Sequence, residues 1–151
     1  MKHITRSALV EHSAGEIYAL VEAIESYPQF LPWCVSARVS ERTDRRTVAT
    51  LEVGMKGVRQ SFTTENLKSP DAGMEMRLLE GPFRTFSATW RFIPLEARAA
   101  KIEFALSYEF SSAILARLLD PLFEYIADTM VDAFIRRADS VHGRAHGSNS
   151  G

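Results

Sequence analysis

The feature that most constrains this chain is a long run of short segments in which apolar and polar side chains alternate. The run extends from residue 34 to residue 110, and turn residues interrupt it repeatedly. Segments 86–92 and 102–110 show the pattern most clearly. Successive side chains of a strand point to opposite faces, so the alternation predicts strands with one buried and one solvated face. Such strands joined by short turns form an antiparallel sheet.

The turn residues divide this run into six predicted strands. Turns are expected at 44–45, 54–57, 70–73 and 81–82, where Asp, Gly and Pro gather. The predicted strands are 35–40, 48–55, 58–67, 74–78, 86–92 and 102–110. Residues 2–10 predict one more strand, which makes seven.

A helix start signal follows the first predicted strand. Ser13-Ala14-Gly15-Glu16 has the spacing of a capping box, with Ser13 as the N-cap and Glu16 reaching back. Apolar residues at helical spacing follow, and they predict a helix over 13–25.

The next segment, Tyr27 to Trp33, is unusually rich in aromatic residues. Its prolines, Pro28 and Pro32, exclude a long helix or a central strand, so we expect a tight turn or a single helical turn. Two interpretations remain open: the aromatic side chains either plug the wide end of the sheet or gate the mouth of a pocket.

The C-terminal region carries one apolar stripe at helical spacing, from Phe123 to Val141. A helix over 121–142 would be about 33 Å long, enough to cross a whole sheet. Asp120-Pro121 is typical of a helix start, so we expect a kink or break there in a helical region that opens at Ile114. The small, polar residues 143–151 are expected to be a disordered or vector-derived tail.

This order of elements predicts an α+β fold in a single domain over residues 1–142. A curved, seven-stranded antiparallel sheet would surround the long C-terminal helix, with a short helical pair near the N-terminus. Such a sheet and a single helix rarely fill the volume between them. The space left would have apolar walls, which is the profile of a small-molecule pocket.

The inward faces of these elements supply the candidate ligand-binding residues. Most are aromatic residues or methionines, and three are polar: Gln60, Thr64 and Tyr108. Two interpretations of the polar side chains remain open. They either orient the polar head of a ligand, or they find hydrogen-bond partners within the core or lie at a sheet edge. The full candidate set is Tyr27, Phe30, Leu31, Trp33, Gln60, Phe62, Thr64, Met76, Phe83, Phe86, Trp90, Phe104, Tyr108, Phe123 and Met130.

Composition excludes several classes of function. Eighteen basic and nineteen acidic residues give a net charge of −1, which argues against a DNA-binding protein. The single cysteine, Cys34, lies in an apolar stretch and is expected to be a small buried hydrophobe. No zinc-binding pattern is present, and we predict no metal site. The N-terminus lacks the apolar core of a signal peptide, so we expect a cytoplasmic protein, at most peripheral at the inner membrane.

Four short blocks resemble one known family. They are Tyr27-Pro28-Gln29-Phe30-Leu31-Pro32-Trp33-Cys34, Phe62-Thr63-Thr64, Gly81-Pro82-Phe83 and Trp90-Arg91-Phe92. In this order they resemble the coenzyme Q-binding protein and RatA-type family of the START-like, polyketide cyclase/dehydrase (SRPBCC) superfamily. The resemblance covers residues 1–142 and implies the helix-grip, or Bet v 1-like, fold with an apolar ligand cavity.

The family resemblance implies two functions. Our main prediction is non-catalytic binding of ubiquinone or a polyisoprenoid lipid, which supports respiratory electron transport and needs no cofactor beyond the bound lipid. Tyr27, Phe30, Leu31 and Trp33 would form a mouth that makes transient contact with a membrane.

The alternative is a RatA-type toxin that binds the large ribosomal subunit and blocks subunit association. This function would need a basic surface to meet RNA phosphates. The candidates are Arg42, Arg45, Arg46, Arg136 and Arg137.

A third candidate function is an enzyme, such as a cyclase acting on an aromatic polyketide. General acid–base catalysis needs a titratable group in the cavity, and the predicted inward faces carry almost none. We expect the histidines, His3, His12, His142 and His146, at the surface. We therefore predict no catalytic residue and no enzyme.

Overall fold

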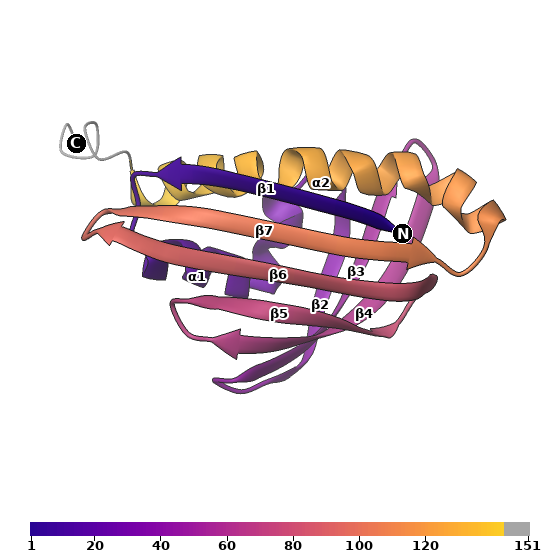
Figure 1. Ribbon diagram of the computed structural model, residues 1–151, viewed down its shortest axis with the longest axis horizontal. Coiled ribbons are helices and arrows are strands. Elements are labelled where there is room, and N and C mark those ends of the chain that lie inside the picture. Colours follow the sequence, from indigo (N-terminus) through magenta and orange to yellow (C-terminus); the bar gives the residue numbers. More distant parts are fainter. Residues whose placement is uncertain (144–151) are drawn as a thin grey trace.

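The computed structural model describes residues 1–143, which form one curved sheet, two short helical segments and one long helix (Figure 1). The elements in chain order are β1 (Lys2–Val10), α1 (Ala14–Glu22), η1 (Ile24–Gln29), β2 (Cys34–Arg42), β3 (Arg46–Met55), β4 (Val58–Ser69), β5 (Gly73–Glu80), β6 (Phe83–Glu96), β7 (Ala99–Phe110) and α2 (Ala113–His142). The predicted tail lies outside the described residues, apart from Gly143.

The sheet has seven antiparallel strands in the order β1-β7-β6-β5-β4-β3-β2. Strands β2 to β7 follow one another as hairpins, and β1 joins the far edge by pairing with β7. In that pair Lys2 lies opposite Tyr108 and Val10 lies opposite Ala100. The prediction of seven antiparallel strands is therefore confirmed.

Four of the five hairpin turns fall where the turn residues predicted them, and the turn between β6 and β7, at Ala97 and Arg98, was not predicted. Between β3 and β4, Lys56 and Gly57 both have positive φ angles, of 51° and 82°. Two residues in this conformation give the tight hairpin that suits the twist of the flanking strands. The turn between β4 and β5 likewise contains Asp71, with a φ of 64°.

The capping box at the start of α1 is confirmed. The backbone N–H of Glu16 donates to Ser13 Oγ at 3.1 Å, and the N–H of Ser13 donates to Glu16 Oε1 at 3.0 Å. The predicted helix over 13–25 is too long, because α1 ends at Glu22 and a 3₁₀ helix, η1, follows. The tighter turn of η1 lets two residues three apart, Ile24 and Tyr27, both face the core.

Of the predicted kink or break at Pro121, the break is wrong, because α2 is continuous there, and the kink stays a prediction. Helix α2 begins at Ala113, with Ser112 as N-cap accepting from the N–H of Leu115 at 3.2 Å, and continues through Pro121 to His142. Proline removes one backbone hydrogen bond, but Leu119 and Leu122 are buried on either side and hold the helix in place.

Charged side chains fasten α2 to the edge strand β1, which lies beside it in Figure 1. Lys2 forms an ion pair with Glu124 and lies 3.8 Å from a carboxylate oxygen of Asp120. Arg6 forms an ion pair with Asp128. Asp120 thus pairs with a strand instead of capping a helix.

The core lies between α2 and the concave face of the sheet. Around the first half of α2, Phe123 contacts the rings of Phe83 and Phe110, with centroid distances of 5.2 and 5.5 Å. Around the second half, Phe134 packs edge-on against Tyr27 and Trp90, each at 5.4 Å. Edge-to-face contacts of this kind add to the stabilisation that burial provides.

Candidate functional site

An apolar cavity of about 60 Å³, here called the interior cavity, lies between α2 and the inner face of the sheet. Strands β3 to β7, the region from η1 to Trp33, and α2 all contribute side chains. Its lining is Tyr27, Trp33, Leu51, Val53, Phe62, Met76, Phe86, Ala88, Trp90, Phe104, Leu106, Phe123, Ile126 and Met130.

Many predicted candidates meet at this cavity. Those that line it are Tyr27, Trp33, Phe62, Met76, Phe86, Trp90, Phe104, Phe123 and Met130. Sequence reasoning left out Leu51, Val53, Ala88, Leu106 and Ile126, which also line it. A signal for them existed: Ala88, Leu106 and Ile126 share an inward face with selected residues, and Leu51 and Val53 lie on one face of an alternating strand from which no candidate was selected. The selection favoured large aromatic and polar residues over aliphatic ones.

Six candidates lie away from the interior cavity. Phe30 packs on Phe134, with a centroid distance of 5.2 Å, and Leu31 is fully buried. Phe83 and Tyr108 belong to the aromatic cluster around Phe123. The side-chain amide of Gln60 donates to the carbonyl of its neighbour, Ser61, at 3.0 Å, and Thr64 donates to Asn66 Oδ1 at 2.8 Å.

The segment from Tyr27 to Trp33 forms a plug in this structure. Tyr27 and Trp33 are 9% and 3% exposed, and the Tyr27 hydroxyl donates to the carbonyl of Val21. The indole N–H of Trp33 is buried and has no hydrogen-bond partner. With Leu31 also buried, three of the four residues predicted to form a membrane-facing mouth lie inside the protein.

The interior cavity is small for a lipid site. Pockets that bind drug-sized ligands usually enclose roughly 300–1,000 Å³, well above the about 60 Å³ found here. A quinone ring with an isoprenoid tail would have to displace side chains to enter. Met76 and Met130 are the most adaptable side chains in the wall, since a thioether chain changes rotamer readily.

The chemistry of the lining is unsuited to acid–base catalysis. Tyr27 is the one titratable side chain in the described lining, and burial raises its pKa above the ordinary value. Nearby, burial raises the pKa of the buried Cys34 thiol to about 11, and burial raises the pKa of Tyr108 to about 12. These groups stay protonated at neutral pH, whereas an efficient general base has a pKa near the working pH.

Several buried polar residues lie outside the cavity lining, and sequence reasoning missed most of them. His12 is 1% exposed, with its Nε2 atom 2.7 Å from Asp139 Oδ1, so the prediction of a surface histidine is wrong here. The start of α1 and the end of α2 close over the ring, which local sequence does not reveal. Lys68 is also buried, and its ammonium lies 3.1 Å from Glu22 Oε1.

The five arginines proposed for RNA contact do not form one basic surface. Arg42 pairs with Glu22 and Glu25, at 2.7 and 2.5 Å. Arg46 pairs with Glu41 and Glu65, at 2.9 and 2.6 Å.

Arg137 donates to Gln29 Oε1 at 2.8 Å and stacks over Phe30. Arg45 and Arg136 are exposed and have no ion-pair partner among residues 1–143. Acidic neighbours thus neutralise two of the predicted arginines, and a third packs against an aromatic ring.

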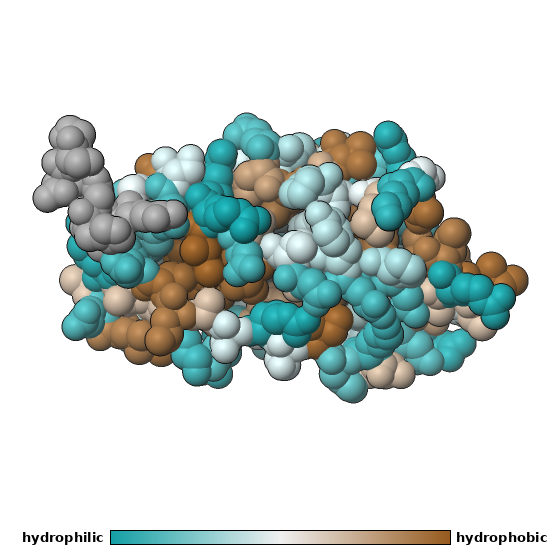
Figure 2. Space-filling view, turned by 90° about the horizontal axis from the view of Figure 1, so that it is seen from above, coloured by the Kyte–Doolittle hydropathy of each residue, from teal (hydrophilic) through white to brown (hydrophobic). Residues whose placement is uncertain are grey.

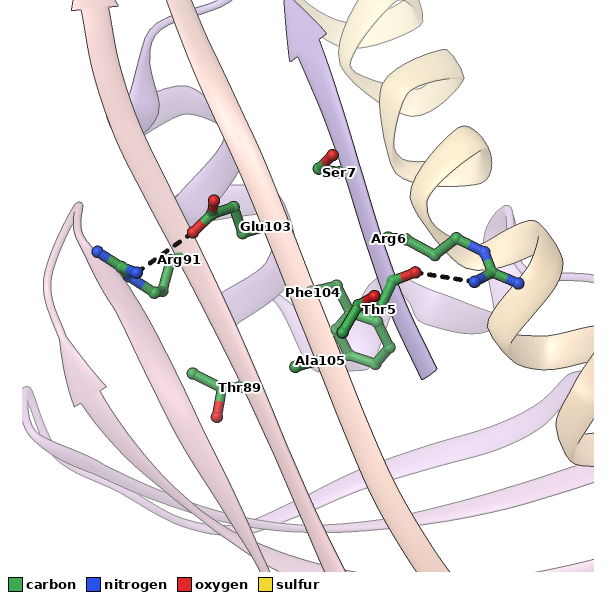
Figure 3. A pocket seen from close by; sticks show the side chains of 8 residues that line it. All are labelled: Thr5, Arg6, Ser7, Thr89, Arg91, Glu103, Phe104 and Ala105. Carbon is green, nitrogen blue, oxygen red and sulfur yellow. Dashed lines mark hydrogen bonds and ion pairs between the residues drawn. The ribbon is translucent and has the colours of Figure 1, made fainter. Parts of the chain in front are cut away.

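A larger hollow, of about 450 Å³, lies on the outer face of β1, β6 and β7 (Figure 3). Short side chains form its floor, including Thr5, Ser7 and Thr89. Of its three charged members, Arg91 and Glu103 pair with each other at 3.3 Å, and Arg6 pairs with Asp128. It is an open depression of a solvated sheet face, and it offers no buried unpaired group to a ligand.

The described residues hold neither a cluster of candidate metal ligands nor a membrane-spanning helix. Within residues 1–143, no group of three His, Cys, Asp or Glu side chains is placed to hold a metal ion. In the same range, no helix is both long and apolar enough to cross a bilayer.

Comparison with known proteins relates the chain to several named relatives. It is 39% identical over 143 residues to the ribosome association toxin RatA of Vibrio cholerae, which covers 95% of this chain and 99% of that protein. It is 28% identical over 144 residues to the mitochondrial coenzyme Q-binding protein COQ10 homolog B of Xenopus laevis, covering 93% of this chain and 59% of that protein.

Solved structures confirm the helix-grip fold. The Zhui aromatase/cyclase from Streptomyces sp. R1128 superposes with a TM-score of 0.84 at 18% identity, over 97% of this chain and 98% of that one. The family model described as polyketide cyclase/dehydrase and lipid transport matches residues 10–135. A seven-stranded sheet that grips a long helix, an apolar interior and this match lead to one conclusion: the chain belongs to the polyketide cyclase/dehydrase and lipid transport family.

Proposed function

We propose that this protein is a ribosome-association factor of the RatA type, which binds the large ribosomal subunit in the cytoplasm and opposes subunit joining. The observation that carries the proposal is the nearly filled interior, with a cavity of only about 60 Å³. A protein whose interior is packed acts most directly through its surface. The 39% identity to a ribosome association toxin over almost the whole of both chains supports the same function.

The surface charges determine how strongly the affinity for the ribosome would depend on salt concentration. Most arginines near the β2–β3 turn are held by carboxylates, and Arg45 and Arg136 remain unpaired within residues 1–143. Each phosphate contact adds to the salt dependence of binding to a nucleic acid. If Arg45 and Arg136 alone of the five candidate arginines contact phosphates, binding should weaken only moderately as the salt concentration rises.

Sucrose gradients test the proposal. Purified protein is added to dissociated bacterial subunits, and the magnesium concentration is then raised to allow joining. We expect the joined-ribosome peak to fall and the free-subunit peaks to rise, in proportion to added protein. Arg45→Ala with Arg136→Ala should weaken the effect. Arg91→Ala is the matched control, because that guanidinium already pairs with Glu103. An unchanged profile with the wild-type protein would refute the proposal.

A second candidate function is non-catalytic binding of a hydrophobic quinone, and one observation favours it. Trp33 lines the interior cavity, and its indole N–H is buried without a partner. A buried donor without an acceptor costs about 1–3 kcal/mol, which a ligand carbonyl could recover. The relationship to a coenzyme Q-binding protein is consistent with such a ligand.

Tryptophan fluorescence distinguishes this second function. A quinone with a short isoprenoid tail should quench the emission saturably, and Trp33→Phe should lower its affinity by about tenfold, which corresponds to one lost hydrogen bond of about 1.4 kcal/mol. Trp90→Phe serves as the control, since Trp90 also lines the cavity but is not among the buried groups without partners. Absence of saturable quenching would remove the quinone from consideration.

A further inference from the structure

The first turns of α2 expose large apolar side chains. Ile114 and Leu118 are 79% and 53% exposed, Tyr125 is 39% exposed, and Pro121 is exposed between them. Spacings of four, three and four residues place all of them on one face of the helix. This set is called the α2 apolar ridge. Figure 2 shows hydrophobic surface at the end of the molecule where α2 begins.

The ridge is distinct from the core-facing side of the same helix. Leu119, Leu122 and Phe123 are buried against the sheet, so the ridge lies on the solvent side. Further along that solvent side the residues become charged, at Asp132 and Arg136. A soluble helix normally carries polar residues over its whole outer face, so the apolar first half indicates a contact with a partner.

The charges around the ridge fit an anionic partner. Arg117 is exposed within the ridge segment and has no acidic partner among residues 1–143. The two carboxylates of this segment, Asp120 and Glu124, share one cation, the Lys2 ammonium, which balances one of their two charges. Arg117 is therefore the exposed cation of this segment that remains available to an anionic partner, and it lies on the same side of the helix as the apolar side chains.

The shape of the ridge favours a lipid surface over a protein groove. In Figure 1 the first turns of α2 extend past the ends of the strands, as a projecting helix end. Helices that lie in the interface of a bilayer bury an apolar face and keep basic side chains near the headgroups. Tyrosine is also suited to this interface, because its ring is apolar and its hydroxyl is polar.

We propose that the α2 apolar ridge, with Arg117, docks this protein on bilayers that contain anionic lipids. The ridge segment also supplies Phe123 to the interior cavity, on the opposite side of the helix. The docking surface and one wall of the cavity therefore belong to the same helical segment. This contact differs from the predicted mouth at Tyr27 to Trp33, most of which is buried. The proposal does not depend on ribosome association.

Vesicle flotation with the full chain tests the proposal. The wild-type protein should float with vesicles of phosphatidylglycerol and phosphatidylcholine, and more weakly with phosphatidylcholine alone. Ile114→Ser with Leu118→Ser should lower the vesicle affinity at least tenfold. Arg117→Ala should remove most of the preference for phosphatidylglycerol. Circular dichroism would verify that each variant is folded.

The matched control removes exposed apolar side chains at the other end of the sheet. Leu9 and Leu95 are 74% and 52% exposed, close to the values of the ridge residues. Leu9→Ser with Leu95→Ser should leave vesicle binding within twofold of the wild type. An equal loss in both double variants would overturn the proposal, because hydrophobicity alone would then explain binding.

Three other outcomes would also overturn it. The wild-type protein could fail to float with anionic vesicles. Light scattering could show a dimer that Ile114→Ser with Leu118→Ser converts to a monomer, which would assign the ridge to a second copy of the chain. Finally, the ridge variant could float normally and yet lose its effect on ribosomal subunits, which would assign the ridge to the ribosome.

Discussion

The two halves of α2 belong to one uninterrupted helix but lie in different surroundings. The first half is held on one side by β1, through Lys2, and exposes the apolar ridge on the other. The second half is enclosed: Phe134 and Ala138 are fully buried, and Asp139 is bonded to His12. The helix itself is continuous through both halves. The two halves differ because different elements pack against them. The half that is enclosed stabilises the fold, and the half with an exposed face is free to contact a partner.

The enclosure of the second half comes from residues near the N-terminus. His12 and Glu16 lie at the start of α1, and they bond to Asp139 and His142 at the end of α2, at 2.7 and 3.3 Å. The rings of His12 and His142 lie 6.2 Å apart. No comparable contact covers the outer face of the first half in residues 1–143. We therefore expect core substitutions in the second half to cost most, and ridge substitutions to cost little stability.

The largest expected effect is in the buried aromatic cluster. Phe134→Ala should lower the free energy of unfolding by about 3–5 kcal/mol, because it leaves a cavity among Tyr27, Phe30 and Trp90. Leu118→Ala, in the first half, should change it by less than about 0.5 kcal/mol. Urea unfolding followed by circular dichroism measures both. Similar losses in the two variants would mean that the halves do not differ.

The buried histidine should show the next largest effect. His12→Ala should lower the free energy of unfolding by about 1–3 kcal/mol, since it removes the hydrogen bond to Asp139 from a buried site. His3→Ala is the control, because His3 is exposed and its Nδ1 atom shares a hydrogen bond with Ser107 Oγ on the sheet surface. A loss for His3→Ala as large as that for His12→Ala would contradict this account of the enclosed end.

Proline in the helix interior should weaken the first half. Pro121→Ala should raise the free energy of unfolding by roughly half of the ~3 kcal/mol that an interior proline costs, because the surrounding packing already compensates in part. Hydrogen exchange should slow at residues 113–121 and stay unchanged after 130. Pro94→Ala, at an exposed position of β6, provides the comparison. Unchanged exchange in the first half would show that Pro121 does not loosen it.

The smallest effect should come from the ion pairs between β1 and α2. Lys2→Ala or Arg6→Ala should lower the free energy of unfolding by about 0.2–1 kcal/mol, because both partners of each pair are largely exposed. The difference should disappear in 1 M salt, where the screening length is about 3 Å. A salt-independent loss above this range would indicate packing of the side-chain stems as the main contribution.

The fold was largely predictable because its signals are local. Alternation placed Phe62, Trp90 and Phe104 on the inward face, and all three line the interior cavity. The capping box at Ser13 located the start of α1 to within a residue. These predictions held because strand alternation and capping depend on residues two or three positions apart.

The candidate site was predictable only in part. Large inward residues such as Phe123 were identified, but Gln60 shares the alternation of β4 and still bonds locally to Ser61. The volume of the cavity could not be predicted, since it depends on how closely side chains from seven elements interdigitate.

The sequence by itself determined the number and order of the strands, their inward faces and the resemblance to the family, since each follows from short-range patterns along the chain. The tertiary structure alone decided three other features. It buried His12 under the end of α2, and it kept α2 continuous through Pro121 by packing on both sides. It also left Ile114 and Leu118 exposed while filling most of the interior. All three depend on contacts between residues far apart in the chain, and no local pattern encodes how such residues meet.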